Sequence, residues 1–303
     1  MNRGAESAKT RRRGFRLGVT SLVVVSAIAV PSLALGSAAS NAKSFGDSRG
    51  ENFLAPDIVS TTVSNTDAGD VSFAIKVSNR PVFGRDMLIL IFVDTQKGGD
   101  ADSNGADYVI QVESGLPLLF KWNGSDYVRA PNDGGLGYRY PSSGPVIVLN
   151  ANAFGSPKTI KFRELVGSGA TRNGQGDTVY TNFKADASPN GEKEGFSFNV
   201  VTHLKLQAGK ATVSPARPRA GGSVAVVLEV AANDIGLITS GKVACAARLG
   251  GKPLSTQSAK VGNGVATCGF KLPAGSKGKQ LRGTMTVTSR GLTVSRPFSA
   301  TVR

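Results

Sequence analysis

Apolar and polar residues alternate through most of the chain, in short runs separated by glycine, proline, asparagine and aspartate. A period of two puts every second side chain on the same face of a strand and predicts half-buried sheets. No run of useful length has the 3.6-residue period of an amphipathic helix. The first set of predicted strands covers residues 71–77, 87–93, 108–112, 116–122, 127–129, 146–149, 160–166 and 196–201. Short strands at this spacing predict a β-sandwich or barrel.

A second set of strands begins near Leu204 and repeats the alternation over about a hundred residues. About seven short strands in such a length are typical of an immunoglobulin-like sandwich. The Gly-, Pro- and Asp-rich stretch 186–194 precedes the last strand of the first set. The prediction is therefore an all-β chain of two consecutive antiparallel β-sandwiches, over residues 51–202 and 203–303.

The first forty residues have the pattern of an export signal. Arg11, Arg12, Arg13 and Arg16 precede an apolar run over 17–35, and small residues follow at 37–42. Positive charge, an apolar run and then small residues are typical of a cleaved secretory signal peptide, here residues 1–42, with cleavage after Ala39 or Ala42. The paired arginines also fit twin-arginine export. No later run is apolar enough to span a bilayer. We therefore expect a secreted or envelope-associated chain without a transmembrane span.

Charge divides the exported part of the chain in two. Residues 43–202 hold 15 basic and 18 acidic residues, whereas residues 203–303 hold 15 basic residues and only two acids. A net charge of +13 on a small module attracts polyanions, which outside the cell are anionic wall polymers or anionic lipid headgroups. No nucleic-acid-binding motif accompanies the charge, so we expect no specific nucleic-acid partner. The same charge also fits ordinary solubility and the protection of edge strands.

Cys245 and Cys268 are the only cysteines, and both fall at inward-facing positions of their predicted strands. In an exported chain this favours a disulfide over two buried free thiols.

Several strands and loops of the first half occur in an order known from a sandwich superfamily. They are the strands 71–77 and 87–93, with Asn79-Arg80-Pro81 between them, Asp94-Thr95 with the loop 99–108, the Trp122-Asn123-Gly124 hairpin and the segment 186–191 before the closing strand. In this order residues 51–202 resemble the superfamily of DOMON domains and family 9 carbohydrate-binding modules. The second half is similar to the immunoglobulin-like modules of bacterial surface proteins.

The resemblance implies sugar held between aromatic side chains and calcium held in acidic loops, or, in its haem-binding branch, Met and His axial ligands. The chain departs from both patterns. Trp122 is its only tryptophan, so a sandwich of two tryptophans around a sugar is not available. His203 is its only histidine and lies at the domain junction, so we expect no haem.

The loop between the predicted strands 87–93 and 108–112 is rich in hard oxygen ligands of the kind that calcium binds. Residues 100–105 copy the first half of an EF-hand loop, but Gln111 stands where that loop needs glutamate. The loop therefore predicts either a calcium site of another kind or a turn whose side chains cap their own backbone. The candidate ligands are Asp94, Asp100, Asp102, Asn104 and Asp107.

Five residues are candidates for contact with a sugar: Tyr138, Tyr140, Arg139, Trp122 and Tyr127. Aromatic rings stack on the apolar face of sugars, and neighbouring polar groups bind the hydroxyls. Trp122 shares its parity with Leu118 and Phe120, which predicts that it lies in the core. Tyr138 and Tyr140 are expected to be the more exposed pair.

The sequence contains few of the motifs that catalysis would need. Neither a Gly-x-Ser-x-Gly elbow nor a His-Glu-x-x-His motif is present, and Ser276-Lys277-Gly278-Lys279 lacks the partner motifs of a Ser-x-x-Lys enzyme. We therefore expect no enzyme but an exported, non-catalytic cell-envelope protein that binds a cell-wall glycan or an anionic wall polymer. The alternative is a structural or protein-adhesion module without a small-molecule ligand.

Overall fold

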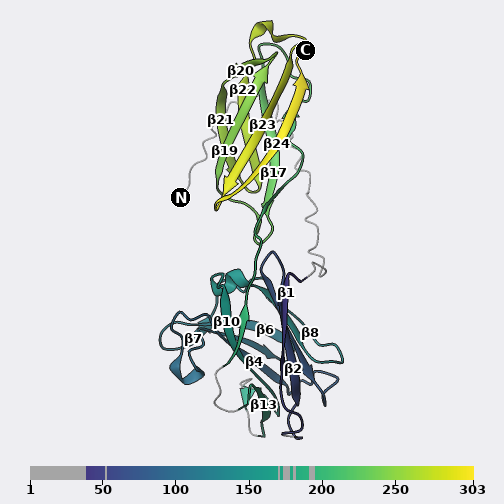
Figure 1. Cartoon of the computed structure of the whole chain (residues 1–303), viewed down its shortest axis with the longest axis vertical. Coiled ribbons are helices and arrows are strands. Elements are labelled where there is room, and N and C mark those ends of the chain that lie inside the picture. Colours follow the sequence, from purple (N-terminus) through teal and green to yellow (C-terminus); the bar gives the residue numbers. More distant parts are fainter. Residues whose placement is uncertain (1–38, 52, 170, 173–177, 180–181, 191–194) are drawn as a thin grey trace, which may run out of the picture. The chain divides into compact units, whose positions relative to one another are not determined.

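The computed structural model describes residues 39–303 except 52, 170, 173–177, 180–181 and 191–194. Its secondary structure consists of β-strands and three short 3-10 helices, which confirms the all-β prediction of two β-sandwiches (Figure 1). None of the helices in these residues has the length and apolar character needed to cross a bilayer. Residues 1–38 of the predicted signal peptide lie outside the described part of the chain.

One sheet of the first sandwich has five strands, and each strand is antiparallel to its neighbours. In spatial order they are β1 (Asn41–Gly46), β2 (Ile58–Asn65), β3 (Asp70–Val77), β9 (Val146–Asn150) and β8 (Gly137–Arg139). The sandwich thus begins at Asn41, ahead of the boundary at residue 51 that the sequence indicated. The segment was missed because β1 is an exposed edge strand that buries only Phe45. Cleavage after Ala42 would remove its first two residues, whereas cleavage after Ala39 would leave it whole.

The other sheet of the first sandwich has seven strands. Six of them follow the order β13 (Lys184–Ser188), β10 (Thr159–Ser168), β4 (Leu88–Asp94), β5 (Tyr108–Glu113), β6 (Leu116–Trp122) and β7 (Tyr127–Arg129), and β14 (Phe196–Asn199) also pairs with β10. A separate two-stranded sheet joins β11 (Thr171–Arg172) and β12 (Thr178–Val179). The Asn-Gly turn between β6 and β7 is as predicted, since Gly124 has a φ of 108° and the Asn123 side chain accepts hydrogen bonds from the backbone of Ser125 and Asp126.

The core between these two sheets is aromatic at its centre. The ring of Phe162 on β10 lies 5.2 Å from that of Phe45 and 5.4 Å from that of Phe73 on β3. Phe73 and Phe162 are almost fully buried, as are Ile91 on β4 and Ile110 on β5. The sheet faces that carry these residues therefore point inward, and residues of the opposite parity point away from the partner sheet.

The burial pattern of β6 contradicts one prediction. Leu118, Phe120 and Trp122 do share a face, but Leu119 is the buried residue, at 2% exposure, and the other three are half-buried. Leu119 pairs with the core residue Ile110, so its neighbours point outward. The run from 118 to 120 is apolar at every position, and alternation cannot select a face in such a run. Trp122 therefore lies outside the core, contrary to the prediction.

The second sandwich also consists of two antiparallel sheets. One contains β15 (Leu206–Ala208), β17 (Ser223–Ala232), β22 (Val265–Lys271) and β21 (Thr256–Gly262), with β16 (Thr212–Ser214) and β18 (Gly236–Leu237) paired to β17. The other follows the order β20 (Lys252–Leu254), β19 (Lys242–Leu249), β23 (Gln280–Ser289) and β24 (Leu292–Thr301). The alternating positions predicted to face inward, such as Val226 and Phe270, are buried between them.

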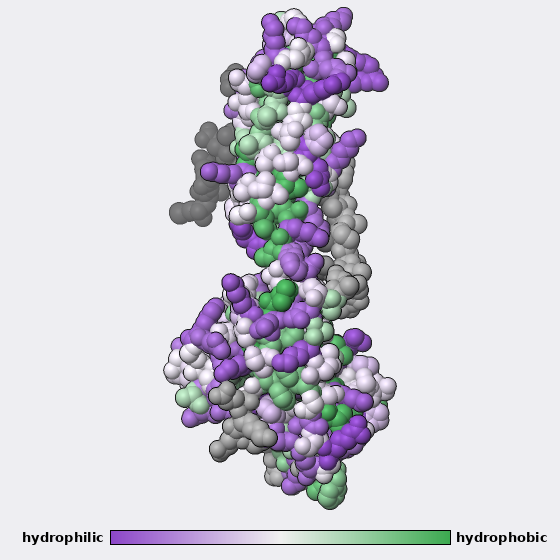
Figure 2. All heavy atoms as spheres, in the orientation of Figure 1, coloured by the Kyte–Doolittle hydropathy of each residue, from purple (hydrophilic) through white to green (hydrophobic). Residues whose placement is uncertain are grey.

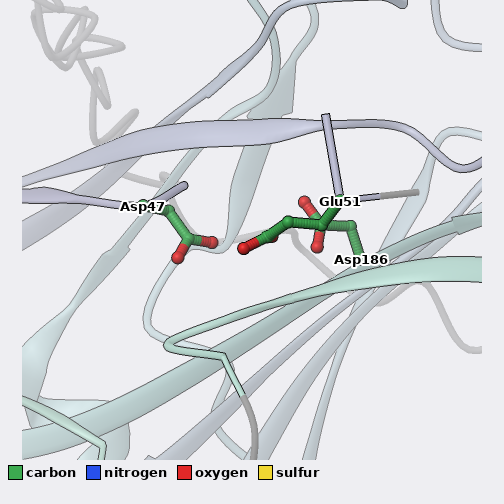
Figure 3. A group of neighbouring side chains, drawn as sticks. All are labelled: Asp47, Glu51 and Asp186. Atoms are coloured by element: carbon green, nitrogen blue, oxygen red, sulfur yellow. The ribbon is translucent and has the colours of Figure 1, made fainter. Parts of the chain in front are cut away.

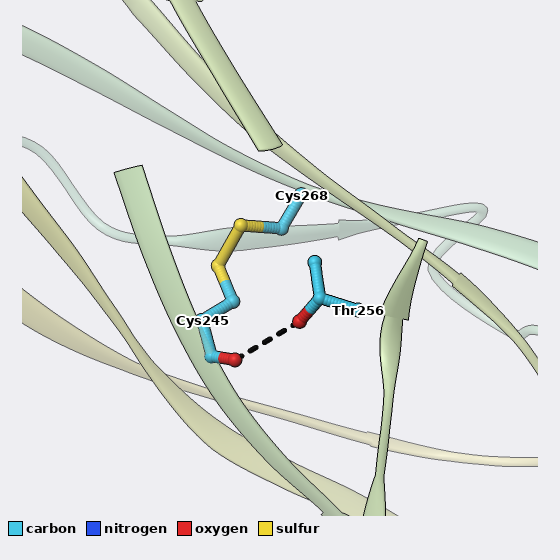
Figure 4. The surroundings of a disulfide bond; sticks show 3 residues. All are labelled: Cys245, Thr256 and Cys268. Carbon is cyan, nitrogen blue, oxygen red and sulfur yellow. Dashed lines mark hydrogen bonds between the residues drawn. A yellow bond between two sulfur atoms is a disulfide. The ribbon is translucent and has the colours of Figure 1, made fainter. Parts of the chain in front are cut away.

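The predicted disulfide is present and joins the two sheets of the second sandwich. Cys245 lies on β19 and Cys268 on β22, with their Cα atoms 6.4 Å apart. The Thr256 hydroxyl donates a hydrogen bond of 3.0 Å to the carbonyl of Cys245 beside the bridge (Figure 4). Cys268 is fully buried, so the bridge crosses the core.

Candidate functional site

The acidic loop folds as a turn stabilised by its own side chains. Asp100 caps the short helix η1 (Ala101–Ser103) and accepts hydrogen bonds from the Asp102 backbone at 3.0 Å and from the Ser103 hydroxyl at 2.6 Å. Asp107 is buried and accepts bonds from the backbone and hydroxyl of Thr95.

The remaining two loop candidates also serve the local backbone. The Asp94 carboxylate accepts from the backbone of Gln96, and Asn104 ends η1 with a φ of 54°. In the described residues, the only three carboxylates with oxygens within 4.8 Å of one another lie elsewhere. The turn alternative accounts for the contacts of Asp94, Asp100 and Asn104, whereas Oδ1 of the buried Asp107 has no hydrogen-bond partner. Calcium at this loop stays a prediction.

Trp122 and Tyr127 lie together beside the acidic loop. Their rings are 5.1 Å apart, and the Tyr127 hydroxyl donates a 2.9 Å hydrogen bond to the carbonyl of Ala106 in the loop. The Trp122 backbone nitrogen donates to the carbonyl of Asp107. Burial raises the pKa of Tyr127 above its ordinary value, so its hydroxyl stays a neutral donor. Two of the predicted sugar-contacting aromatics and the acidic loop are therefore one connected unit.

The outward face of the seven-stranded sheet carries an apolar row across its strands. Strand pairing places Phe92 on β4 opposite Val109 on β5, and Val109 opposite Phe120 on β6. Arg163 on β10 continues the row at one end and Arg129 on β7 at the other. Phe92 and Phe120 are half-buried. We call these five residues the outer row. They place aromatic surface on a sheet face that points away from the core.

A pocket of about 250 Å³ opens between the outer row and the acidic loop. Phe92 and Arg163 of the row line it, together with Asp94, Asn104 and Lys161. Lys161 stands directly opposite Asp94 in the pairing of β10 with β4. The pocket thus combines one aromatic wall with a rim of charged and amide groups, which is the composition of a site for a polar ligand with an apolar face.

Tyr138, Arg139 and Tyr140 lie on or next to β8 in the five-stranded sheet, away from this pocket. Both tyrosines are half-buried and pack on Phe83, with ring centroids 5.6 and 5.5 Å away, and only Arg139 is exposed. The Tyr140 hydroxyl donates to the Arg80 carbonyl at 2.8 Å, and burial raises its pKa to about 12. Burial also raises the pKa of Tyr138, whose hydroxyl is buried without a hydrogen-bond partner. Tyr138 and Tyr140 are thus half-buried, as Trp122 and Tyr127 are, and their rings pack against the core.

The two tyrosines provide a matched pair for a stability measurement. Tyr140→Phe removes a hydrogen bond to a backbone carbonyl and is expected to lower the free energy of unfolding by about 1 kcal/mol. Tyr138→Phe removes a buried hydroxyl that has no partner and is expected to leave stability unchanged or to raise it. Urea denaturation of the two variants measures both values. A larger loss in Tyr138→Phe than in Tyr140→Phe would contradict this assignment.

Three carboxylates that the sequence did not single out converge at the edge of the first sandwich. They belong to Asp47 directly after β1, to Glu51, and to Asp186 on β13. Each carboxylate has an oxygen within 4.8 Å of an oxygen of each of the other two. Figure 3 shows the three side chains pointing toward a common centre. Burial, together with the smaller effect of the Asp47 and Glu51 charges, raises the pKa of Asp186 to about 6. We call these three residues the carboxylate cluster.

Basic side chains gather at one end of the second sandwich, where β19 ends and β23 begins. Arg248 pairs directly with Arg282, and the turn that leads from Arg248 to Lys252 hydrogen-bonds to Gln280. Of the two acids in this half, Asp234 makes a bidentate ion pair with Arg290 and Glu229 lies on β17. Figure 2 shows hydrophilic residues gathered at the end of this sandwich. The basic end consists of Arg248, Lys252, Lys277, Lys279 and Arg282, all exposed.

No protein-family model and no curated protein matches the sequence. Solved structures of titin with tandem immunoglobulin-like domains match the chain at low similarity. A chimeric titin Z1Z2 functionalized with a KLER exogenous peptide from decorin has a TM-score of 0.27 and 9% identity, over 82% of this chain and 97% of that chain. Titin-A168169 has a TM-score of 0.28 and 8% identity, over 78% and 91%. Likeness at this level carries no argument about ligands and assigns no family.

Proposed function

We propose that this chain is an exported, non-catalytic cell-envelope protein whose first sandwich binds a cell-wall glycan. The outer row carries the proposal, because it exposes aromatic surface beside a pocket with a polar rim. Flat aromatic side chains pack on the apolar face of a sugar ring. Lys161, Arg163 and Asp94 at the pocket are of the type that bind sugar hydroxyls or acidic sugar groups. The resemblance of residues 51–202 to DOMON and family 9 carbohydrate-binding modules supports the same ligand class.

The second sandwich is proposed to hold the protein at the envelope through its basic end. Five exposed cations gather where the chain supplies no acid, so their field is not cancelled locally. Such a field attracts anionic polymers, and the attraction weakens as salt rises. Phosphate-rich or carboxylate-rich wall polymers are the partners of matching charge.

Binding to purified cell-wall fragments tests both surfaces of the proposal separately. Phe92→Ala and Phe120→Ala, both in the outer row, are expected to weaken binding to neutral wall glycan about tenfold, which corresponds to about 1.4 kcal/mol. The matched control is Val82→Ala, an exposed apolar residue outside the outer row, and it should bind as the parent does.

The basic end is tested with cell-wall fragments that retain their anionic polymers. The double variant Arg248→Glu, Arg282→Glu is expected to bind them more weakly at low salt and to lose most of the salt dependence. Lys242→Glu changes one charge at the opposite end of β19 and serves as its control. Absence of binding across wall glycans and anionic polymers would reject the proposal and favour the structural or protein-adhesion alternative.

A further inference from the structure

Two arginines of the basic end stand directly opposite one another on the second sandwich. Arg248 on β19 pairs with Arg282 on β23, and both side chains are exposed. Like charges at directly opposed positions of a sheet destabilise it. The second sandwich, which the structure describes in full, has two acidic side chains: Asp234 pairs with Arg290, and Glu229 lies on β17 in the opposite sheet. The repulsion is therefore not offset within this sandwich.

The two guanidinium groups are held beside a groove. The groove has a volume of about 690 Å³ and is lined by β19, β20 and β23, with both arginines among the lining residues. Nη1 of Arg248 donates to the Gly251 carbonyl at 3.0 Å, and Nε of Arg282 donates to the side-chain oxygen of Gln280 at 2.5 Å. Each bond uses one of the five N–H groups of its guanidinium. The protein thus orients both side chains and leaves them donors for a ligand.

Small side chains next to the arginines leave room for a ligand. Ala246 stands opposite Thr284 in the same pairing of β19 with β23, two residues along each strand from the arginine pair. Both are exposed and line the groove, whereas Ala247, which lies between Ala246 and Arg248 in sequence, is buried in the core. Ser255 also lines the groove. The groove therefore combines two cations, two hydroxyl side chains and an uncharged floor.

We propose that this groove binds the phosphate group of a polyol phosphate, with the phosphate between Arg248 and Arg282. A carboxylate has two oxygens in one plane, which a single guanidinium fork satisfies, whereas a phosphate presents oxygens in several directions and can bridge two forks. The hydroxyls of Ser255 and Thr284 are donors and acceptors for the hydroxyls of the polyol. This inference rests on the proposed attachment of the basic end to anionic envelope polymers, and it assigns phosphate as the bound group.

Calorimetric titration of the whole protein at low salt tests the site. The probe is glycerophosphoglycerol, a phosphodiester with one negative charge and two polyol arms. We expect saturable binding of one equivalent. Glucuronate, which has the same charge and similar hydroxyls but carries a carboxylate, is expected to bind about tenfold more weakly, which corresponds to about 1.4 kcal/mol.

A matched pair of variants tests the groove without changing its charge. Ala246→Phe fills the space beside the arginines and is expected to weaken binding of the diester about tenfold. Ala244→Phe places the same ring at an exposed position of β19, opposite Thr286 and outside the groove, and should bind as the parent does. Aromatic residues are favourable in strands, so both variants should fold.

The double variant Arg248→Lys, Arg282→Lys retains both charges but lacks the planar forks, and it should also bind the diester about tenfold more weakly. A parent protein that does not saturate with the diester would overturn the inference. So would equal binding of glucuronate, or diester binding that survives in Ala246→Phe or in the double lysine variant.

Competition identifies the source of the phosphate. Polyol phosphates occur in wall polymers and in the headgroup of phosphatidylglycerol. Displacement of the protein by the diester from wall fragments, or from vesicles of phosphatidylcholine and phosphatidylglycerol, supports the site and assigns its source. Salt-dependent binding of the parent to wall fragments without saturable binding of the diester would leave the attachment standing and reject this site. Diester binding without attachment to wall fragments would support the site and reject the attachment.

Discussion

Replacing both Cys245 and Cys268 with alanine is expected to lower the free energy of unfolding of the second sandwich by about 3 kcal/mol. The bridge closes a loop with a sequence separation of 23 residues, and the chain-entropy model assigns about 3 kcal/mol to a loop of this length. Removal of sulfur from the fully buried Cys268 adds a packing loss to the entropic one. The bridge also holds β19 against β22 across the core, so the two sheets lose the disulfide that joins their side chains.

Urea denaturation followed by circular dichroism measures this change. The single variants Cys245→Ala and Cys268→Ala leave one free thiol and should each lose about as much as the double variant, because either one breaks the bridge. Dithiothreitol should destabilise the parent protein and leave the double variant unaffected. Equal stability of parent and double variant in oxidising buffer would contradict the prediction.

The second sandwich was predictable because its core pattern is local. Burial alternates along β17, β19 and β22, so Val226 and Phe270 identify the inward face, and Cys245 and Cys268 follow the same parity. Here hydrophobic burial and strand periodicity point to the same face at nearly every position. The bridge could be anticipated from parity and export alone, before any pairing of strands was known.

In the first sandwich, sequence failed where a strand is apolar on both faces. Leu118, Leu119 and Phe120 offer burial on either side of β6, and only the pairing of Leu119 with Ile110 decides the question. This pairing points the side chains of Trp122 and Phe120 outward and creates the surface on which the binding proposal rests.

The carboxylate cluster could not be found from sequence, because its members are brought together by long-range pairing. Asp47 and Glu51 are four residues apart, but Asp186 arrives through the pairing of β13 with β10. The conspicuous acidic loop has the opposite character. Its acids are close in sequence, yet Asp100 and Asp107 each bind nearby backbone and side-chain donors. The acids that are close in sequence therefore stabilise a turn, whereas the three carboxylates of the cluster come together only when the strands pair.

Glu164→Gln is expected to stabilise the first sandwich strongly at alkaline pH and little at acidic pH. Complete burial raises the pKa of Glu164 from its ordinary value of 4.5 to about 8, the Thr61 hydroxyl offsets part of this shift, and the charge of Asp47 adds to it. The folded protein therefore holds a proton that the unfolded chain releases above pH 4.5. Unfolding then becomes easier as pH rises from 4.5 to 8, because the unfolded state binds fewer protons in this window.

Glutamine keeps the shape of the protonated carboxyl and its contact with Thr61 but cannot ionise. The variant should consequently lose the fall in stability between pH 4.5 and 8 that Glu164 causes. It should retain the smaller fall between pH 3.8 and about 6 that Asp186 causes, because burial raises the pKa of Asp186 as well. At pH 9 the difference amounts to several kcal/mol, or on the order of 10 °C in melting temperature. Melting curves of both proteins in chelator at pH 5, 7 and 9 measure it. Parallel curves at all three pH values would mean that Glu164 is already ionised in the folded state, and a drop in Glu164→Gln at pH 9 would mean that its charge has a partner.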